Sequence, residues 1–244
     1  MVAFGEPAKF CARKLMASIK RYIPEIPVAL CSDEPMTTGV ADVWVKGKDS
    51  DVGGRRAKLL AYDNTPAEWD AVLYLDADTE IVPPADVLRF FEWIEDGWEF
   101  VICKDPHLMD TLRSYRRRNN VAEMEELKRS FGTLNALMYN GGVWAFGRGE
   151  RIARFFERWR AGWEEKAGRD QGPLLRAMYQ DPLRVLLLGN EWNTFAKYSR
   201  GVETAGLRHY PGRARRWKGL INGRIDGPDA WKAVERFERQ RRSR

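Results

Sequence analysis

Two carboxylates stand one residue apart, at Asp76 and Asp78, in the segment "VLYLDADTEIV" (residues 72–82). The apolar residues around them indicate a buried strand, and unpaired anions beside a core are costly, so we expect a cation to neutralise them. Hard oxygen ligands of this kind suit Mg²⁺ or Mn²⁺ that holds a diphosphate. An EF-hand loop is excluded because Ile81 stands where that loop requires glycine. The structural alternative is that the aspartates only cap a turn.

The elements that position this pair alternate between strands and helices. An apolar segment ends in Gly5, and Phe10, Leu15 and Ile19 then recur at helical spacing after Pro7. We predict further strands over 26–34, 41–47 and 69–78, with a helix over 54–65. This alternation predicts an α/β domain with a mostly parallel central sheet flanked by helices. Ligands of such sheets bind outside the carboxyl ends of the strands, which is where the acidic pair lies.

The second half continues the alternation, beginning with a helix over 83–97 that stops at Gly97. A glycine pair at 141 and 142 is expected to break the strand character of 134–149. The remaining predicted elements are strands over 98–105 and 182–193 and helices over 150–168, 169–180 and 226–242.

Composition predicts one folded domain. The chain has 244 residues, of which 44% are hydrophobic and 31% charged, so it can bury a sizeable core and wholesale disorder is excluded. Cys11, Cys31 and Cys103 are far apart and lie in apolar segments, which predicts reduced, buried thiols and argues against a disulfide framework or a zinc site. No apolar run reaches the roughly 20 residues of a membrane span, and the N-terminus lacks signal-peptide features, so we expect a cytoplasmic protein.

The formal net charge is +6, and the excess of basic residues gathers in three segments, 113–120, 209–218 and 236–244. Such clusters attract the phosphates of a nucleotide, a nucleic acid or an anionic membrane. Solvated surface charge is the ordinary alternative for any one of them.

Four segments together resemble a known family. "AKLLAYDNTPAEWDAVLYLDADTEIV", "YNGGVWAF", "DQGPLL" and "HYPGRARRW" occur in the order and rough spacing of the glycogenin-like and lipopolysaccharide-galactosyltransferase-like retaining glycosyltransferases, which have the GT-A fold. The likeness covers most of the chain. It implies a single GT-A, Rossmann-like domain over 1–200 that binds a nucleotide sugar. It also implies a closing segment with a basic helix over 201–244, within the same globule.

The resemblance implies a metal site. In that family the D-x-D aspartates and a histidine of a late H-x-x-G-x-x-K-P-W motif bind Mn²⁺, so Asp76, Asp78 and His209 are the expected ligands of Mn²⁺ or Mg²⁺. A partly buried imidazole without a ligand role is the alternative for His209. Gly212 matches the motif glycine that holds the diphosphate of a UDP-sugar. Arg215 replaces the motif lysine and keeps its positive charge.

Other positions match donor-binding residues of the family. Lys58 matches a basic residue that reaches the donor phosphate or sugar, and Arg56 is near enough in sequence to replace it; a basic helical face is the alternative. Asn140, Gly141 and Gly142 match a segment under the donor sugar, where missing side chains permit close approach, with a strand bulge as the alternative.

The resemblance also implies roles for residues near the sugar, the nucleotide base and a late turn. Asp170 and Gln171 match a pair that faces the sugar and the reacting carbon, although Asp170 also fits a helix N-cap. Ala3 and Phe4, in the first strand, are expected beside the base and ribose, by position only. Asn193 matches a family turn, where a structural role is expected.

The implied activity is transfer of a sugar from a UDP-sugar to a hydroxyl acceptor, with retention. A divalent cation, Lys58 and Arg215 would stabilise the charge that grows on the leaving phosphate. Two other readings stay open. A sugar-phosphate nucleotidyltransferase would need a glycine-rich basic loop after the first strand, where "FGEPAKF" stands. A non-catalytic nucleic-acid-binding protein would use the basic clusters but leaves the acidic pair unexplained.

Two acceptors fit the basic segments: DNA with hydroxylated bases, or a lipid-linked saccharide at an anionic membrane. A glycosylated protein or a small sugar stays open as an alternative. A modest apolar stripe of Trp231, Val234 and Phe237 would serve the membrane. The basic clusters outweigh this stripe, which favours DNA.

Overall fold

The computed structural model describes residues 1–36, 41–47, 55–82, 86–105, 111–115, 121–164, 170–195 and 205–211, together with the single positions 236 and 240. Most of the two basic segments at 113–120 and 209–218, and most of the predicted terminal helix at 226–242, lie outside these ranges. The division into 1–200 and 201–244 therefore remains a prediction. The described helices are α1 (Glu6–Tyr22), α2 (Arg55–Leu59), α3 (Arg89–Glu95), α4 (Leu112–Tyr115), α5 (Val121–Phe131), α6 (Glu150–Glu164), α7 (Gln171–Gln180) and the 3₁₀ turn η2 (Asn190–Trp192).

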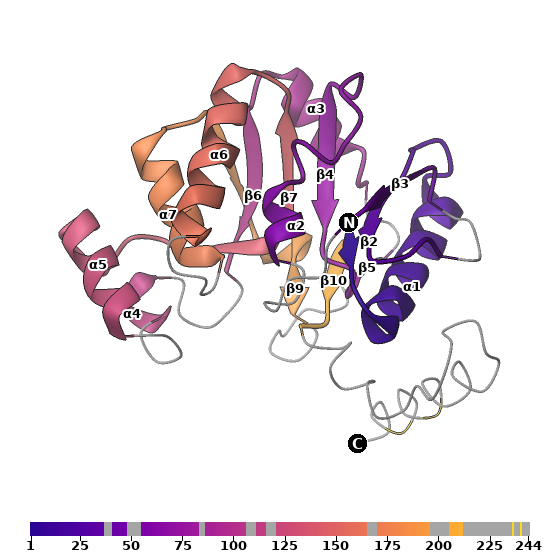
Figure 1. Cartoon of the computed structure of the whole chain (residues 1–244), viewed down its shortest axis with the longest axis horizontal. Coiled ribbons are helices and arrows are strands. Elements are labelled where there is room, and N and C mark those ends of the chain that lie inside the picture. The colour runs from indigo at the N-terminus through magenta and orange to yellow at the C-terminus, as the bar shows by residue number, and fades with distance from the viewer. Residues whose placement is uncertain are drawn as a thin grey trace.

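Strands alternate with these helices as the sequence predicts, and the α/β class is confirmed (Figure 1). The described strands are β1 (Val2–Ala3), β2 (Ala29–Ser32), β3 (Val43–Lys46), β4 (Ala71–Leu75), β5 (Thr79–Ile81), β6 (Phe100–Lys104), β7 (Tyr139–Gly147), β8 (Val185–Leu188), β9 (Thr194–Phe195) and β10 (Leu207–His209).

Two sheets form the centre of the molecule. One has the order β1-β2-β3 and is parallel throughout. The other has the order β4-β7-β6-β8, in which β4, β6 and β8 share one direction and β7 runs against them. The shared direction brings the carboxyl ends of β4 and β6 to the same edge, and antiparallel β7 begins there. Residues 139–142 of β7 therefore lie beside the segment that follows β4.

A third, small sheet joins distant parts of the sequence. Strand β10 pairs antiparallel with β5, with His209 opposite Thr79, and parallel with β9, with His209 opposite Phe195. This pairing holds the late histidine next to the segment that carries the two aspartates (Figure 1).

Local sequence explains the main helices. Helix α1 has a proline in its first turn and buries Phe10, Leu15 and Ile19, as the helical spacing predicts. Helix α3 begins later than predicted, at Arg89, and is followed by Gly97 in the left-handed region, with φ of 90°. The glycine pair does not break the strand, because β7 runs through it from residue 139 to 147. Instead the pairing of β6 with β7 shifts register opposite this pair, between Ile102 and Lys104.

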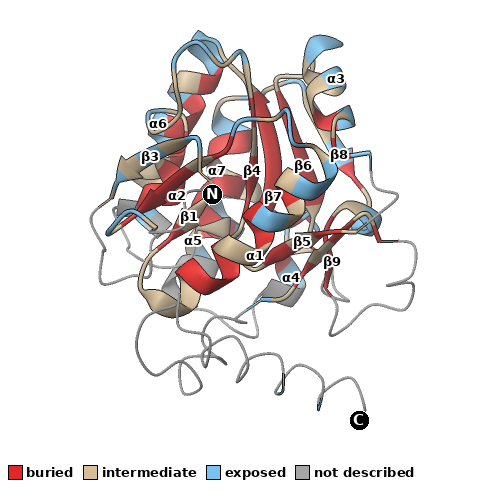
Figure 2. Ribbon diagram, turned by 90° about the vertical axis from the view of Figure 1, so that its right-hand side faces the viewer, coloured by how far each residue is buried: buried red, intermediate tan, exposed pale blue. Residues whose placement is uncertain are grey.

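The core lies on both faces of the four-stranded sheet (Figure 2). On one face Trp144 of β7 stacks on Tyr74 of β4, with ring centroids 4.4 Å apart, and packs edge-on against Trp159 of α6. Strand β6 is fully buried from Phe100 to Cys103, as expected for a strand covered on both faces. The three cysteines are buried thiols outside any disulfide, which agrees with the sequence prediction. None of the described helices has both the length and the apolar character that crossing a bilayer requires.

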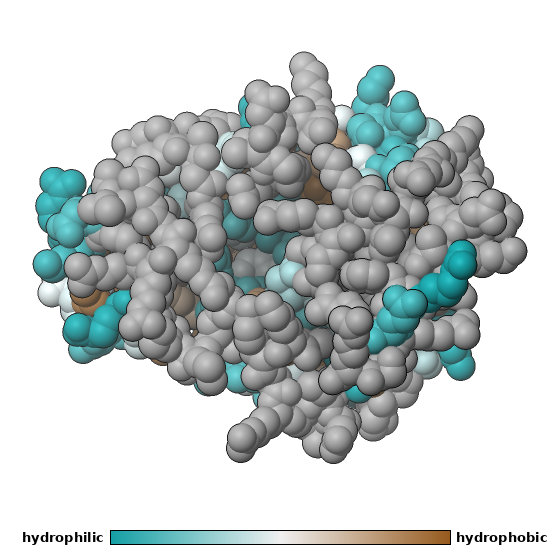
Figure 3. Space-filling view, turned by 90° about the horizontal axis from the view of Figure 1, so that it is seen from below, coloured by the Kyte–Doolittle hydropathy of each residue, from teal (hydrophilic) through white to brown (hydrophobic). Residues whose placement is uncertain are grey.

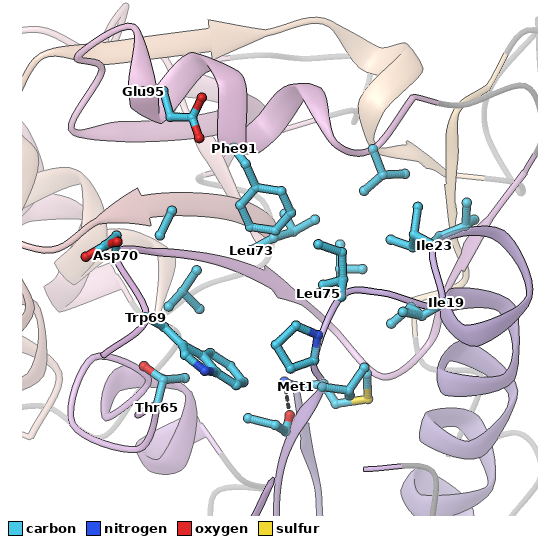
Figure 4. Close-up of a pocket in the computed structure, with 18 residues that line it drawn as sticks. Met1, Ile19, Ile23, Thr65, Trp69, Asp70, Leu73, Leu75, Phe91 and Glu95 are labelled. Carbon is cyan, nitrogen blue, oxygen red and sulfur yellow. Dashed lines mark hydrogen bonds between the residues drawn. The ribbon is translucent and has the colours of Figure 1, made fainter. Parts of the chain in front are cut away.

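An apolar cavity of about 350 Å³ separates the two central sheets. Among the described residues, β4 pairs only with β7, so its other edge faces this cavity and not a strand. Phe91, Leu73, Ile19 and Trp69 project into it (Figure 4). The walls of the cavity are therefore hydrophobic. The carboxylates of Asp70 and Glu95 lie near its border (Figure 4).

Candidate active site

The structure brings together the three residues that the sequence predicts as metal ligands. Asp76 and Asp78 follow β4, and His209 ends β10. The Nε2 atom of His209 lies 3.3 Å from an oxygen of Asp78 and 3.8 Å from an oxygen of Asp76. One potential ligand atom from each residue lies within 4.8 Å of the others.

This geometry fits a divalent cation. Neighbouring ligands of an octahedral ion with bonds of about 2.1 Å lie about 3 Å apart, close to the two distances from His209. Two carboxylates and one imidazole also suit Mn²⁺, which accepts oxygen ligands together with an imidazole nitrogen. The site therefore fits a metal ion in spacing and in ligand type.

The backbone of β7 forms one wall of this site. A Cβ on Gly142 would lie 2.4 Å from Cε1 of His209 and 2.9 Å from Oδ2 of Asp76. A Cβ on Gly141 would lie 2.9 Å from Oδ2 of Asp170 and 3.2 Å from Nζ of Lys58. Neither glycine is among those with a positive φ angle, so the backbone conformation does not require glycine here. The lack of space for a side chain does. The strand-bulge alternative is present as the register shift between β6 and β7, while the close approach of a donor sugar stays a prediction.

Lys58 is buried between two carboxylates. Its Nζ lies 3.1 Å from Oδ1 of Asp76 and 3.2 Å from Oδ2 of Asp170. Burial disfavours the charged ammonium, but the charges of Asp170 and Asp76 outweigh this effect and raise the pKa of Lys58. Lys58 is thus a permanent cation that ties the residue after β4 to the start of α7.

Tyr74 supports the same carboxylate from the core side. Its hydroxyl donates to Oδ1 of Asp76 at 2.9 Å. Burial, with the negative charge of Asp76 as a further cause, raises the pKa of Tyr74 well above 10.0, so the phenol remains a hydrogen-bond donor. Asp76 therefore receives donors from two sides while its other oxygen faces His209.

Asp170 occupies the N-cap position of α7, but its side chain makes no capping hydrogen bond. The Asp170 side chain therefore does not cap the helix, and its carboxylate lies beside Lys58 instead. The neighbouring Gln171 donates from Nε2 to Oδ2 of Asp105 at 2.7 Å and to the carbonyl of Tyr139 at 3.1 Å. Both residues of the predicted pair thus face the inside of the site.

These residues line a polar cavity of about 240 Å³, whose other walls come from Asn140, Phe195 and Pro211. Hydrophilic residues are visible in the hollow of the face toward which β4 points (Figure 3). Two predicted nucleotide-binding residues, Ala3 and Phe4, do not line this cavity, and Phe4 instead lies against Gly47. Arg56 is exposed and does not line it either. Gly212 and Arg215 lie outside the described residues.

Sequence reasoning missed Asp105. It is buried directly after β6 and lines the same cavity as Asp76. The rule that drew attention to Asp76, a carboxylate at the carboxyl end of a buried strand, applies equally to Asp105 in "VICKD". The signal was present, but a single aspartate lacks the D-x-D pattern.

Similar folds were found among solved structures. Three of these are the bifunctional glycosyltransferase WbbM (TM-score 0.62, 12% identity), mouse xyloside xylosyltransferase 1 (0.56, 12%) and the galactosyltransferase LgtC (0.53, 15%). The match covers 96% of this chain for WbbM and LgtC and 86% for the xylosyltransferase. The chain has the GT-A glycosyltransferase fold.

The matches differ in how much of each relative they include. The alignment covers 93% of LgtC and 96% of the xylosyltransferase, but only 51% of the WbbM chain, so this GT-A chain spans about half of that protein. No model of a protein family and no curated protein matches the sequence.

Proposed function

We propose that this GT-A chain is a metal-dependent glycosyltransferase that moves a sugar, as a hexosyl unit, from a UDP-sugar to a hydroxyl acceptor with retention of configuration. The observation that carries the proposal is the cluster of Asp76, Asp78 and His209 at the carboxyl end of β4. The similar folds support sugar transfer, since their names describe a galactosyltransferase and a xylosyltransferase, and of these two the galactosyltransferase transfers a hexose.

Asp76, Asp78 and His209 would hold Mn²⁺, or Mg²⁺ in its place. When bound, the ion supplies Lewis-acid stabilisation to the diphosphate leaving group. Asp76 is fixed for this task by donors from Lys58 and Tyr74, so its orientation does not depend on the ligand. Gly142 leaves the space between Asp76 and His209 open for the ion.

Lys58, Asp170 and Gln171 are proposed to bind the donor sugar and its phosphate. Lys58 keeps its charge at neutral pH and stands where negative charge would grow as the sugar departs. Asp170 and Gln171 line the same cavity, where the Asp170 carboxylate and the amide oxygen of Gln171 would accept hydrogen bonds from sugar hydroxyls, since Nε2 of Gln171 already donates to Asp105 and Tyr139. In this proposal Asp170 orients the sugar and steadies positive charge at the anomeric carbon, and it is not assigned a nucleophilic role.

A donor screen tests the proposal. The protein is incubated with Mn²⁺ or Mg²⁺ and a panel of UDP-sugars that includes UDP-galactose and UDP-xylose, and released UDP is measured. We expect metal-dependent release that His209→Ala removes. Formation of UTP and a sugar 1-phosphate when pyrophosphate is added to the UDP-sugar would indicate the nucleotidyltransferase alternative. No turnover of any donor, combined with salt-sensitive binding to nucleic acid, would indicate a binding protein.

The acceptor is tested with the active donor. DNA containing hydroxymethylated bases, lipid-linked glycans and free oligosaccharides are each incubated with protein and donor, and the mass of the acceptor is measured. The basic residues support DNA as the proposed acceptor, and Arg113 is one such residue with an exposed side chain in the described part of the chain. Gain of mass only on a glycan would contradict the DNA proposal and leave the glycosyltransferase proposal intact.

A further inference from the structure

We propose that Asn193 is a positioning residue that fixes the protonation pattern of the His209 ring, so that Nε2 presents its lone pair to Asp76 and Asp78. Asn193 is fully buried and follows η2. It lies outside the polar cavity and contacts His209 from behind. The inference rests on the proposed function in that it assigns this lone pair to a bound divalent cation.

The first link is a backbone group whose role is unambiguous. The N–H of Gly142 donates to Oδ1 of Asn140 at 2.8 Å. A backbone N–H is only a donor, so the side-chain atom that faces it must be the amide oxygen of Asn140. The orientation of the Asn140 amide, which is ordinarily ambiguous, is therefore fixed by chemistry.

The second link passes this orientation to Asn193. The same oxygen of Asn140 lies 2.9 Å from the terminal amide of Asn193. Because an oxygen acceptor requires a donor, the Asn193 atom at this contact must be Nδ2. The other atom of that amide, Oδ1, then lies 2.9 Å from Nδ1 of His209.

The third link fixes the ring. Oδ1 of Asn193 is only an acceptor, so Nδ1 of His209 must carry a hydrogen. In the neutral imidazole the lone pair is then on Nε2, the atom that faces Asp78 at 3.3 Å. Gly142 thus determines, through two asparagines, which nitrogen of His209 can bind a cation.

The surroundings hold this arrangement in place. His209 is 4% exposed and Asn140 is 7% exposed, so water has little access to the hydrogen bonds. The ring of Phe195 meets the His209 ring edge-on, with centroids 4.9 Å apart and planes at 83°. Phe195 therefore sets the plane of the imidazole, and Asn193 sets which edge faces the acidic pair.

Loss of the partner that orients a metal-binding histidine typically lowers metal affinity about 10- to 100-fold. Asn193→Leu removes both polar atoms at similar volume, so the ring loses the acceptor for Nδ1–H. We expect the affinity of the Asn193→Leu protein for Mn²⁺ to fall about 10- to 100-fold. Asn193→Asp keeps an acceptor for Nδ1–H but loses the donor to Asn140, so we expect it to recover part of the affinity.

The test uses the full chain in two measurements. Nitrogen NMR of the metal-free protein reports which imidazole nitrogen carries hydrogen, and His107→Gln removes the other of the two histidines to assign the signal. Calorimetric titration with Mn²⁺ alone gives the affinity. We expect hydrogen on Nδ1 in the wild type and in Asn193→Asp, and a hydrogen on Nε2 in a substantial fraction of Asn193→Leu molecules.

The outcomes separate this inference from the proposed function. A wild-type ring protonated only on Nε2 overturns the inference without any variant, even if Asn193→Leu fails to fold. Equal Mn²⁺ affinity of folded Asn193→Leu and wild type also overturns it. Wild type that does not bind Mn²⁺ contradicts the proposed function, while the NMR measurement on the metal-free protein still decides the role of Asn193.

Discussion

Two cavities flank β4 and differ in chemistry more than in size. The apolar one measures about 350 Å³ and the polar one about 240 Å³. The apolar cavity lies along the unpaired edge of β4, whereas the polar cavity lies beyond its carboxyl end. Of the two, the apolar cavity has the larger volume, yet sheets of this kind bind ligands at the carboxyl ends of their strands, where the polar cavity lies.

The difference is that polar groups in the smaller cavity hold one another in place. Lys58 bridges Asp76 and Asp170, and Gln171 binds Asp105, so each contact joins a different pair of elements. In the larger cavity the walls are apolar side chains such as Leu73 and Phe91, for which shape and volume matter. Substitutions in the polar cavity should therefore change activity, and those in the apolar cavity should change stability.

The largest effect is expected from Asp76→Asn. The substitution keeps the shape of the side chain but removes a negative metal ligand, so we expect UDP release to fall by roughly 10²- to 10³-fold. Steady-state assays at saturating donor measure this. Asp63→Asn is the matched control, because Asp63 is an exposed partner of Arg160 outside the cavity. Activity of Asp76→Asn equal to that of Asp63→Asn would remove the distinction between the polar cavity and the surface.

Gly142→Ala tests whether the open space between Asp76 and His209 is needed. The new Cβ would meet Cε1 of His209 at 2.4 Å, so the ring must shift and we expect Mn²⁺ affinity to fall about 10- to 100-fold. Calorimetric titration measures the affinity. Gly149→Ala is the control, since a Cβ there meets no heavy atom within 4 Å. Unchanged affinity in Gly142→Ala would show that the site tolerates a methyl group where a cation is proposed.

The sequence predicted the polar cavity better than the apolar one, for a physical reason. The acidic pair and His209 belong to motifs that can be recognised from residue spacing along the sequence, and the structure places the three residues together. The apolar cavity depends on which strands pair with β4, a choice made by contacts between segments distant in sequence. Local patterns indicate that a strand exists but not its neighbours.

Side-chain direction was also beyond the sequence. Asp170 was expected either to cap α7 or to face the sugar, and only the position of Lys58 shows that its carboxylate turns inward. Asn193 was expected to be structural because it matches a family turn, and nothing in the sequence indicated its contact with His209, which lies 16 residues away. Ala3 and Phe4 were expected beside the base and ribose by position in the first strand; they do not line the polar cavity, and their contact with a nucleotide stays a prediction.

Phe91→Ala should produce the opposite pattern in the apolar cavity. Its ring projects into that cavity (Figure 4), and because it is only partly buried we expect a loss of about 1–2 kcal/mol in the free energy of unfolding, below the usual cost of a fully buried ring. Urea unfolding measures the loss, and Phe91→Leu should recover most of it. Activity per folded molecule should not change. A fall in kcat without a fall in stability would mean that the two cavities are coupled.

The smallest effect is expected from substitution of Asp42, which binds a residue that lines the apolar cavity. Oδ2 of Asp42 accepts from Nζ of Lys20 at 2.8 Å and from the N–H of Val28, a cavity residue, at 2.7 Å. The bond from Lys20, followed by that from Val28, lowers the pKa of Asp42 below 3.8.

Because the pKa of Asp42 is lower in the folded state, its contribution to stability is present above pH 3.8 and is lost as the pH falls through the lower, folded value. Asp42 is partly exposed, so we expect Asp42→Asn to cost less than about 1 kcal/mol at pH 7. The difference in urea midpoint between wild type and variant should shrink toward pH 3. Glu25→Gln, an exposed carboxyl near the same edge, should show a smaller difference at pH 7. A gap between Asp42→Asn and wild type that stays constant from pH 7 to pH 3 would mean that the charge of Asp42 does not hold Val28 at the cavity wall.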